Sequence, residues 1–416
     1  MAGDWGAFGA GHCAPQARPC AQSAPLSKQV LIAGAGMGGL AAAIASARAG
    51  WQPRVFEQAP GFTEAGAGIQ LGPNATRVLE AWGLGTALAR VAAFPQRLAV
   101  RSAGNGDLLA QLPLGEAALE RYGAPYVTIH RADLHRVLLE GAAATGAELL
   151  VDARIERVRE AADAVLVGLG GPAEIQGDAL VGADGLWSRV RQQVWADGAP
   201  APTGHVAYRT LIAQHTLAPA LRSDEVTVWL GPRLHVVTYP VRAGEWLNVV
   251  AIVQGTVAAH PEGWDQFAVA ADLREALGAT CETLQELVQA APDWLLWVLH
   301  ERPPLKGAQA MSHGRVALLG DAAHPMRPYL AQGAGMAIED AQELGRCLAM
   351  ARERIADPAT ALRRYSLNRW ERCARVQRQA ERNGRIFHAT GPVQWGRDLS
   401  LRLLGERLLD QPWLYR

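Results

Sequence analysis

The sequence predicts an α/β protein in which a unit of strand, glycine-rich loop and helix is combined with a separate β-rich region. Three observations predict this class: a glycine-rich loop within residues 30–48, β-rich runs between about 204 and 254, and a helical pattern beyond residue 332. The chain has 416 residues, of which 49% are hydrophobic and 19% charged. At about 150 residues per domain, this length predicts two or three globular domains.

The first strand and helix enclose a loop with the sequence GAGMGG. We expect the strand over Val30–Ala33 and the helix from the loop to about Arg48. In such a loop the first glycine permits a tight turn, the second lets the backbone approach a pyrophosphate, and the third lets the helix pack closely on the strand. The start of the helix offers N–H groups and partial positive charge to a phosphate. The loop glycines are Gly34, Gly36, Gly38 and Gly39.

A second strand supports the same interpretation. It is expected over Pro53–Phe56 and ends in Glu57, about 20 residues after the glycines, where a carboxylate can accept hydrogen bonds from a ribose. The uncharged run Val30–Ala47 is also about as long as the shortest membrane span. Because dinucleotide binding explains the strand, loop, helix and acidic residue together, we predict a dinucleotide site and no membrane segment.

The remaining elements alternate between helix and strand patterns. The run RADLHRVLLE is amphipathic and predicts a helix, whereas the alternating runs between 148 and 182 predict a β-meander. The expected ranges are a glycine-rich turn and helix within Gly66–Leu84, a strand Tyr126–Ile129, a helix Arg131–Glu140, the β-meander 148–182, a sheet 204–254, helices at about 264–277 and 282–290, a strand Val316–Leu319, and helices beyond Gln332.

Composition and charge exclude several classes of protein. Lysine and arginine balance aspartate and glutamate at 40 each, so the chain lacks the basic field that nucleic-acid binding requires. The five cysteines are scattered without CxxC spacing, which favours a reduced, cytoplasmic protein without disulfides. No HExxH or similar spacing is present, and we predict no metal. Residues 1–28 lack the apolar core of a signal peptide and are expected to be a disordered extension.

Three separated motifs together point to a known family. They are the loop Gly34–Gly39, the GADG run Gly182–Gly185, and the GDAAHP run Gly320–Pro325. With this triple motif the chain resembles the single-component FAD-dependent aromatic hydroxylases, which include 4-hydroxybenzoate, salicylate and 3-hydroxybenzoate hydroxylases. The resemblance implies a glutathione-reductase-type FAD-binding domain, an inserted mixed β-sheet substrate domain and C-terminal helices. The implied boundaries are 29–100, 126–200 and 305–350 for the FAD domain, 101–125 and 201–304 for the substrate domain, and 351–416 for the helical region.

The resemblance also assigns residues to the flavin nucleotide. Asp321 follows a strand and would hold a ribose or ribityl hydroxyl, although it also suits an N-cap of the next helix. Asp184 would serve FAD and nicotinamide binding, with a turn residue as the alternative, and Arg131 would contact the nucleotide, with a surface ion pair as the alternative. The backbone at the start of the helix after Gln332 would face the flavin ring and stabilise its reduced, negative form. Further positions implied by the family are Gln58, Gln70, Ile155, Gly333, Ala334 and Gly335.

The reaction that the resemblance implies is hydroxylation through a flavin C4a-hydroperoxide. The sequence has no second GxGxxG motif, so NADH or NADPH would visit the FAD domain transiently, and NADH is favoured by analogy with nearer relatives. Molecular oxygen supplies the hydroxyl oxygen. Flavin halogenases share the fold, but the run Asp293–Trp297 does not match their WxWxIP motif and neither Lys28 nor Lys306 lies in such a motif.

A general base is expected in the β-rich region. A phenol has a pKa near 10 like tyrosine, so its reaction as a phenolate at neutral pH needs a proton acceptor. His235 and Tyr239 lie four residues apart, on one face of a regular strand, and the relatives carry an HxxxY pair here. We predict His235 as base and Tyr239 as its substrate-orienting partner, with a structural histidine as the alternative. His324 is expected to be structural.

Other positions bear on the substrate. Pro328 follows the GDAAHP run as in 4-hydroxybenzoate hydroxylase, where the proline carbonyl faces the reacting groups. Arg209, Arg233 and Arg327 are candidates for binding a substrate carboxylate. The prediction is a cytoplasmic FAD-dependent monooxygenase of aromatic catabolism, a monomer or homodimer, that acts on a small phenolic or hydroxy-heteroaromatic acid. The alternatives are a flavin reductase or oxidase acting on a lipid or isoprenoid, and a flavin-binding sensor without catalysis.

Overall fold

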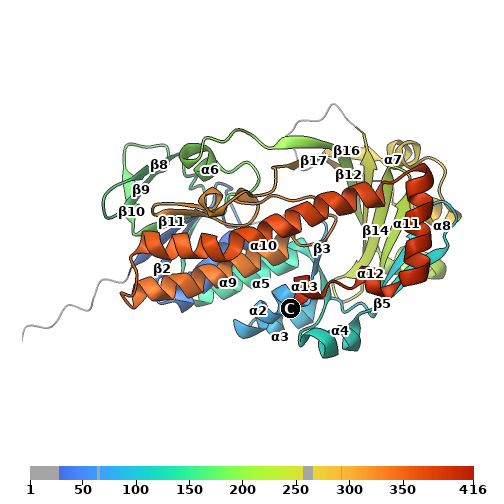
Figure 1. Cartoon of the computed structure of the whole chain (residues 1–416), viewed down its shortest axis with the longest axis horizontal. Helices are drawn as coiled ribbons and strands as arrows, with labels where there is room; N and C mark the ends of the chain where they lie inside the picture. The colour runs from blue at the N-terminus through green and yellow to red at the C-terminus, as the bar shows by residue number, and fades with distance from the viewer. Residues whose placement is uncertain (1–27, 63–65, 256–265, 292) are drawn as a thin grey trace, which may run out of the picture.

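The computed structural model describes residues 28–62, 66–255, 266–291 and 293–416. Two sheets lie toward opposite ends of an elongated molecule, and the long helix α10 (Pro358–Phe387) runs between them (Figure 1). The extension predicted for residues 1–28 lies outside the described residues, apart from Lys28. Among the described residues no helix is both long and apolar enough to cross a bilayer.

The first sheet has six strands, and its central strands are parallel. β1 pairs with β2 on one side and with β11 on the other, and Val30, Leu31 and Ile32 of β1 are fully buried. Such continuous burial is expected for a parallel strand covered on both faces. The helix α1 (Met37–Arg48) follows β1, as predicted from the glycine loop. The strand order is β18 (Ser312–His313), β19 (Val316–Leu318), β11 (Ala179–Gly182), β1 (Gln29–Ala33), β2 (Gln52–Phe56) and β7 (Glu148–Leu150).

The second sheet has eight strands and corresponds to the predicted β-rich region. Its central pairs β12·β15 and β15·β14 are antiparallel, whereas β13 pairs with β4 in parallel. β4 begins at Arg97, before the predicted domain boundary at residue 101. The strand order is β16 (Gln266–Val269), β17 (Asp293–Glu301), β12 (Ala201–Ala213), β15 (Trp246–Gln254), β14 (Leu234–Val241), β13 (Val226–Gly231), β4 (Arg97–Ser102) and β5 (Leu108–Pro113).

One predicted helix is partly wrong. The expected range 264–277 starts outside the described residues, and Gln266–Val269 forms the edge strand β16, which pairs with β17. The helix α7 begins only at Ala270 and ends at Leu277. The residues of β16 gain ladder hydrogen bonds from a strand that lies about 25 residues later, and a local helical pattern does not contain this information.

Smaller elements complete the fold. β3 and β6 form a two-stranded ribbon, and β8, β9 and β10 form a three-stranded meander. Their bounds, with those of the helices beside them, are β3 (Gly68–Leu71), α2 (Pro73–Ala81), α3 (Gly85–Val91), α4 (Gly115–Tyr122), β6 (Val127–His130), α5 (Arg131–Ala144), β8 (Arg157–Glu160), β9 (Val165–Gly168), β10 (Glu174–Gly177), α6 (Arg189–Val194) and α8 (Glu282–Gln289).

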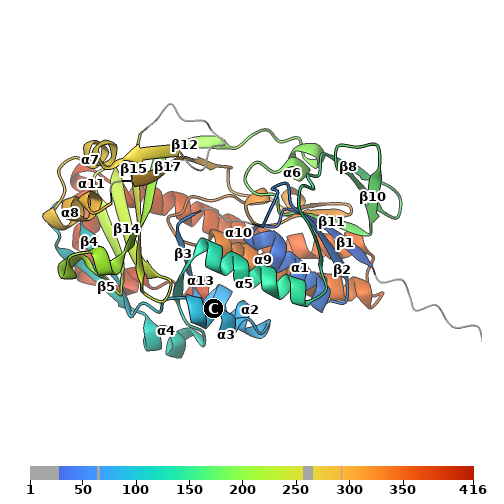
Figure 2. The ribbon, with the colours of Figure 1, turned by 180° about the vertical axis from the view of Figure 1, so that it is seen from behind.

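The C-terminal helices pack against both halves of the molecule. α9 (Gly333–Arg352) packs against α1 and crosses the predicted boundary at residue 351, and α10 packs along α9. α11 (Gly391–Leu404) then stands beside the second sheet, as both views show (Figures 1 and 2). The short helices α12 (Glu406–Leu409) and α13 (Pro412–Tyr415) return the chain to α2. The C-terminal fifth of the chain therefore contacts both sheets.

Candidate active site

A cavity of about 320 Å³ is lined by residues from both halves of the molecule. Four regions form its walls: the glycine loop with the start of α1, the strand β3, the start of α9 with the loop before it, and one face of the second sheet. These regions are far apart in the sequence. Several of the predicted FAD residues and the predicted catalytic pair therefore line the same cavity.

The glycine loop forms one end of the cavity. Gly36 and Gly38 line it, and Gly36 is the N-cap of α1, whose first turn receives no side-chain hydrogen bond. The N–H groups of that turn thus remain for a ligand. Gly34 has a φ of +91°, and a Cβ atom there would lie 2.6 Å from the oxygen of Ala183. A Cβ atom on Gly39 would lie 1.9 Å from the oxygen of Gly34. Only glycine fits these two positions.

We expect Gly39→Ala to abolish FAD binding. The added methyl group would overlap the Gly34 carbonyl and would force α1 away from the turn, at a cost of about 1–3 kcal/mol of stability. The measurement is the ratio of flavin to protein absorbance after purification, together with the thermal midpoint. Gly171→Ala is the matched control, since nothing lies within 4 Å of a Cβ atom there. Stoichiometric flavin in Gly39→Ala would contradict the assigned role of this loop.

The start of α9 forms another part of the wall. Gly333 and Ala334 line the cavity, and Gly335 lies just behind them. No side chain caps this helix of 20 residues, so its free N–H groups and positive dipole end are available to a ligand. Asp321 also lines the cavity, is open to it, and makes no hydrogen bond within the described residues. Its carboxylate is therefore available to a hydroxyl group, and Pro328 lines the same wall.

Two predicted carboxylates are engaged by the backbone. Glu57 accepts hydrogen bonds from the N–H groups of Ala35 (2.8 Å) and Ala59 (2.9 Å), which fixes the glycine loop to the end of β2. Asp184 accepts from the Ser188 hydroxyl (2.6 Å) and from the N–H of Arg189 (2.7 Å) at the start of α6. This arrangement matches the alternative of a turn residue for the Asp184 carboxylate, while the neighbouring backbone lines the cavity.

The other predicted FAD positions divide into two groups. Arg131, at the start of α5, and Gln70, on β3, both line the cavity. The Gln70 side chain accepts a hydrogen bond from the Tyr126 hydroxyl at 2.6 Å. Gln58 is exposed and Ile155 is buried in the core, and neither lines the cavity. The roles of these four residues stay predictions.

One face of the second sheet supplies the catalytic candidates. His235, Val237 and Tyr239 alternate along β14 and all line the cavity, as expected for residues two apart on a strand. The ladder places Ile252 opposite His235 and Val250 opposite Val237, and both line the cavity as well. This face is therefore apolar except for a few polar groups, which is typical of a site for a small ring.

Tyr239 has a restricted role. Its hydroxyl donates to the oxygen of Gly68 at 2.7 Å, which ties β14 to β3, and burial raises its pKa. Because its single proton is used in this way, Tyr239 can offer only an acceptor lone pair to a substrate. Tyr239 can accept a hydrogen bond from a phenol that still carries its proton, and so can orient it. It has no second proton with which to donate a hydrogen bond to a phenolate.

His235 has a partner that was not predicted. Its Nδ1 atom lies 2.8 Å from Nε2 of His388, the residue after α10, and His235 is only 1% exposed. Burial, together with the neighbouring His388 and His205, lowers the pKa of His235 well below its usual value. A cation is disfavoured here, so His235 is neutral at pH 7 and keeps a lone pair.

Of the three arginines considered for a carboxylate, the structure brings only Arg209 to the cavity. It lies on β12, is 5% exposed, and stacks over Trp297 with 4.2 Å between its guanidinium carbon and the ring centre. Arg327 instead makes a bidentate ion pair with Glu301, at 2.5 and 2.6 Å. Arg233 is exposed in the hairpin turn before β14.

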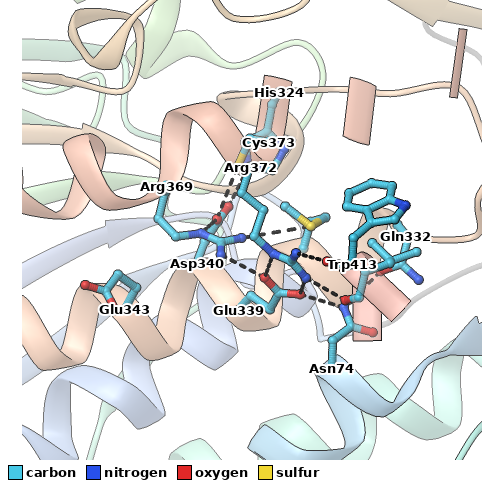
Figure 3. A network of polar contacts seen from close by, with 12 residues as sticks. Asn74, His324, Gln332, Glu339, Asp340, Glu343, Arg369, Arg372, Cys373 and Trp413 are labelled. Atoms are coloured by element: carbon cyan, nitrogen blue, oxygen red, sulfur yellow. Dashed lines mark hydrogen bonds and ion pairs between the residues drawn. The ribbon is translucent and has the colours of Figure 1, made fainter. Parts of the chain in front are cut away.

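A buried polar network fixes the GDAAHP run behind the cavity (Figure 3). Asp340 of α9 accepts from Arg369 of α10 (2.7 Å), contacts His324 (2.5 Å) and receives the N–H of Gly320 (3.1 Å). His324 is therefore structural, as predicted. Asp340, His324 and Cys373 have ligand atoms within 4.8 Å of one another, but the Arg369 cation already occupies the Asp340 carboxylate. The arrangement is that of an ion-pair network.

No local sequence pattern indicates the residues that complete this site. His388 lies 153 positions from His235, and Asp340 lies 29 positions from Arg369 on a different helix. Tyr329 packs its ring 5.1 Å from that of His235, and a Cβ atom on Gly384 of α10 would lie 2.8 Å from it. A close approach of α10 thus forms this corner of the site, and only the folded chain reveals it.

Comparisons with known proteins agree with this geometry. Residues 27–380 match a family described as "FAD binding domain". The chain is 39% identical over 398 residues to a 3-hydroxybenzoate 6-hydroxylase of Polaromonas naphthalenivorans strain CJ2, covering 94% of this chain and 96% of that one. It is 37% identical over 360 residues to a 6-hydroxynicotinate 3-monooxygenase of Bordetella bronchiseptica strain RB50, covering 85% and 91%. A solved structure of Klebsiella pneumoniae HpxO with FAD and uric acid superposes with a TM-score of 0.81 at 27% identity, covering 92% and 94%.

The residues present fit FAD. Glycines line the cavity at the uncapped start of α1, so no side chain blocks the approach of a ligand to the helix N–H groups. The uncapped start of α9 also lines the cavity, and the Asp321 carboxylate is open to it. These groups suit a pyrophosphate, a flavin ring and a sugar hydroxyl respectively. The chain therefore belongs to the FAD-binding-domain family and is an FAD-dependent aromatic monooxygenase, which uses NAD(P)H and O2.

Proposed function

We propose that this enzyme hydroxylates a small phenolic or hydroxy-heteroaromatic acid and that NADH is its preferred reductant. The observation that supports this most is the placement of a neutral, buried histidine and a buried arginine on one apolar face of the cavity. His235 can take the proton of a ring hydroxyl, and Arg209 can pair with a carboxylate. The relatives named for 3-hydroxybenzoate and 6-hydroxynicotinate act on rings that carry both groups.

The positions of these side chains orient the ring. In the sheet, Val250 pairs with both Val237 of β14 and Arg209 of β12, so Arg209 lies on the same face as His235, two strands away from β14. A ring that contacts both residues would lie across β15, with Val250 and Ile252 beneath it. A fixed position of this kind lets the enzyme direct hydroxylation to one carbon.

The cofactor supplies the electron transfer and oxygen activation, and the protein supplies binding, orientation and proton transfer. His235 accepts the hydroxyl proton of the substrate and so raises the electron density of the ring. The uncapped start of α9 stabilises negative charge at the site. Apolar residues, including Val237, Ile252 and Met326, exclude water from the reacting atoms.

A panel assay tests this proposal. The purified protein, loaded with FAD, is mixed with NADH and O2 and with each of several hydroxylated benzoic and nicotinic acids, and NADH oxidation and product are both measured. We expect at least one such acid to accelerate NADH oxidation and to yield a product with one more oxygen atom. Acceleration by a lipid or isoprenoid alone would support the reductase or oxidase alternative, and turnover of none would support the non-catalytic sensor.

Arg209→Gln is expected to raise the KM for a hydroxylated aromatic acid by about 10- to 100-fold. A hydrogen-bonded pair with a charged group contributes about 1.5–3 kcal/mol, which the variant would lose. The same variant should bind the corresponding phenol without a carboxylate about as well as wild type does. Arg233→Gln is the matched control, because Arg233 is exposed in a turn. An equal KM increase for both ligands would contradict a carboxylate contact.

The cellular setting belongs to the same proposal. We propose a cytoplasmic enzyme that acts as a monomer or homodimer. The free cysteines Cys281, Cys347 and Cys373, of which the last two are buried, support a reducing compartment. Sedimentation of the purified protein would distinguish monomer from homodimer.

A further inference from the structure

Beyond the proposed function, on which this inference rests, we propose that His388 is a positioning and proton-relay residue that completes the base His235. The geometry that points to it is the 2.8 Å contact between Nδ1 of His235 and Nε2 of His388, made inside the protein. The two residues come from different parts of the fold. His235 lies on β14, whereas His388 ends α10, which has run from the first sheet to the second.

The contact determines the tautomer of His235. One proton lies between the two nitrogen atoms, so one histidine donates and the other accepts. If His235 donates from Nδ1, its Nε2 atom carries a lone pair and can accept the proton of a substrate. If His388 donates instead, a neutral His235 carries its proton on Nε2 and cannot act as a base. The role of His235 as base therefore requires His388 to accept.

A single buried imidazole is poorly suited to keep the proton. Burial, His205 and the nearby Arg327 and Arg397 lower the pKa of His388 to about 3. Burial, His388 and His205 lower the pKa of His235. The charged and titratable groups that face the pair are His205 of β12, Glu301 of β17, Arg327 and Tyr329 before α9, and Arg397 of α11. Most of these groups oppose a positive charge on either imidazole, and transfer of the proton onward to water avoids such a charge.

The relay balances as a set of three transfers. The phenol O–H bond breaks and an Nε2–H bond forms on His235. The Nδ1–H bond of His235 breaks and an Nε2–H bond forms on His388. The Nδ1–H bond of His388 then breaks and its proton passes to water. Both imidazoles end neutral, with exchanged tautomers, and the substrate is left as the phenolate.

The second nitrogen of His388 is suited to the last transfer. Its Nδ1 atom is buried and has no hydrogen-bond partner among the described residues. Buried polar atoms in this position are usually satisfied by water, which would receive the proton. The oxygen of His388 meanwhile accepts the N–H of Arg233 at 3.1 Å, in the hairpin turn two residues before His235. His388 thus contacts both the ring of the base and the backbone of the turn that precedes it.

The test compares His388→Gly, His388→Gln and the control His205→Gln in the FAD-loaded enzyme, with the acid that wild type hydroxylates. Glutamine can accept the Nδ1–H proton of His235 in a hydrogen bond but cannot relay it. His205 packs its ring 4.9 Å from His388, while its own Nδ1 contacts the oxygen of Thr203. We expect both His388 variants to keep flavin and KM, to lose 10- to 100-fold in kcat at pH 7, and to recover as the pH approaches 10, where a phenol ionises by itself.

Imidazole rescue distinguishes relay from packing. Added imidazole should restore kcat of His388→Gly at least tenfold and should leave His388→Gln and His205→Gln unchanged. The relay is overturned if His388→Gln has wild-type kcat at pH 7, or if the loss in His388→Gly responds to neither imidazole nor pH. A wild-type enzyme that hydroxylates no phenolic acid overturns the proposed function itself, so the two failures are distinct.

Discussion

His235→Ala is expected to lower kcat for hydroxylation at neutral pH by about 10²- to 10⁴-fold, the range that general acid–base catalysis contributes. FAD content should be unchanged, because His235 lies on the second sheet and the flavin positions lie at the starts of α1 and α9. The variant should regain activity as the pH approaches the pKa of the substrate phenol. Product formation, followed from pH 6 to pH 10, measures both effects.

An exposed histidine in the same half of the molecule is the control for this experiment. His215→Ala changes a side chain outside the cavity and should keep wild-type kcat at every pH. A flat ratio of wild-type to His235→Ala rates across the pH range would remove proton transfer from the role of His235. The structural alternative predicts that outcome, together with a lower thermal midpoint.

Asp340→Asn is expected to destabilise the protein by about 3–5 kcal/mol, the cost of removing one partner from a buried ion pair. Asp340 is fully buried and is shared by Arg369, His324 and the N–H of Gly320 (Figure 3). The neutral amide would remove the negative charge that pairs with Arg369 and His324 and would weaken the contacts that hold the GDAAHP run in place. Urea unfolding at pH 7 measures the change in free energy, and flavin absorbance measures the effect on the cavity.

The effect of Asp340 should depend on pH in a defined direction. Burial alone would raise the pKa of Asp340, but the charges of His324 and Arg369 outweigh burial and hold it below its usual value. A depressed carboxyl pKa contributes stability that is complete above about pH 4 and is lost as the pH falls further. The difference between wild type and Asp340→Asn should therefore shrink below pH 4.

A carboxylate one turn along the same helix provides the control. Glu343 pairs with Arg346, whose side chain is 71% exposed, and such pairs contribute at most about 1 kcal/mol. Glu343→Gln should therefore unfold within about 1 kcal/mol of wild type and should bind FAD normally. If Asp340→Asn and Glu343→Gln unfolded at the same urea concentration, the network would not stabilise the fold.

Sequence reasoning succeeded where the physical signal is local. The strand, glycine turn and helix around Gly34 follow from contacts within 20 residues, and the observed strand Gln29–Ala33 extends the prediction by one residue. The alternation that placed His235 and Tyr239 on one face is equally local, and both residues line the cavity. The strand Gln266–Val269 was predicted as helix because the partner that makes it a strand is distant in the sequence.

The remainder of the site depends on contacts that no local pattern encodes. The pairing of His235 with His388, and the position of Arg209 beside Trp297, arise only when α10 and three strands pack together. Sequence alone also could not separate a ligand-binding carboxylate from one that binds backbone. Glu57 and Asp184 were predicted for the same cofactor as Asp321, yet their oxygens accept backbone N–H groups while Asp321 is open to the cavity.

The length of α10 has a consequence for how this protein can change in evolution. The helix is anchored in its first half by Arg369 to Asp340, and His388, the residue after its end, contacts His235. Inserting or deleting one residue between these two points would rotate the end by about 100° and shift it by about 1.5 Å. The number of residues in α10 thus sets the spacing between the flavin half and the substrate half. Related proteins can vary the lengths of their loops, but α10 can change its length only by whole helical turns.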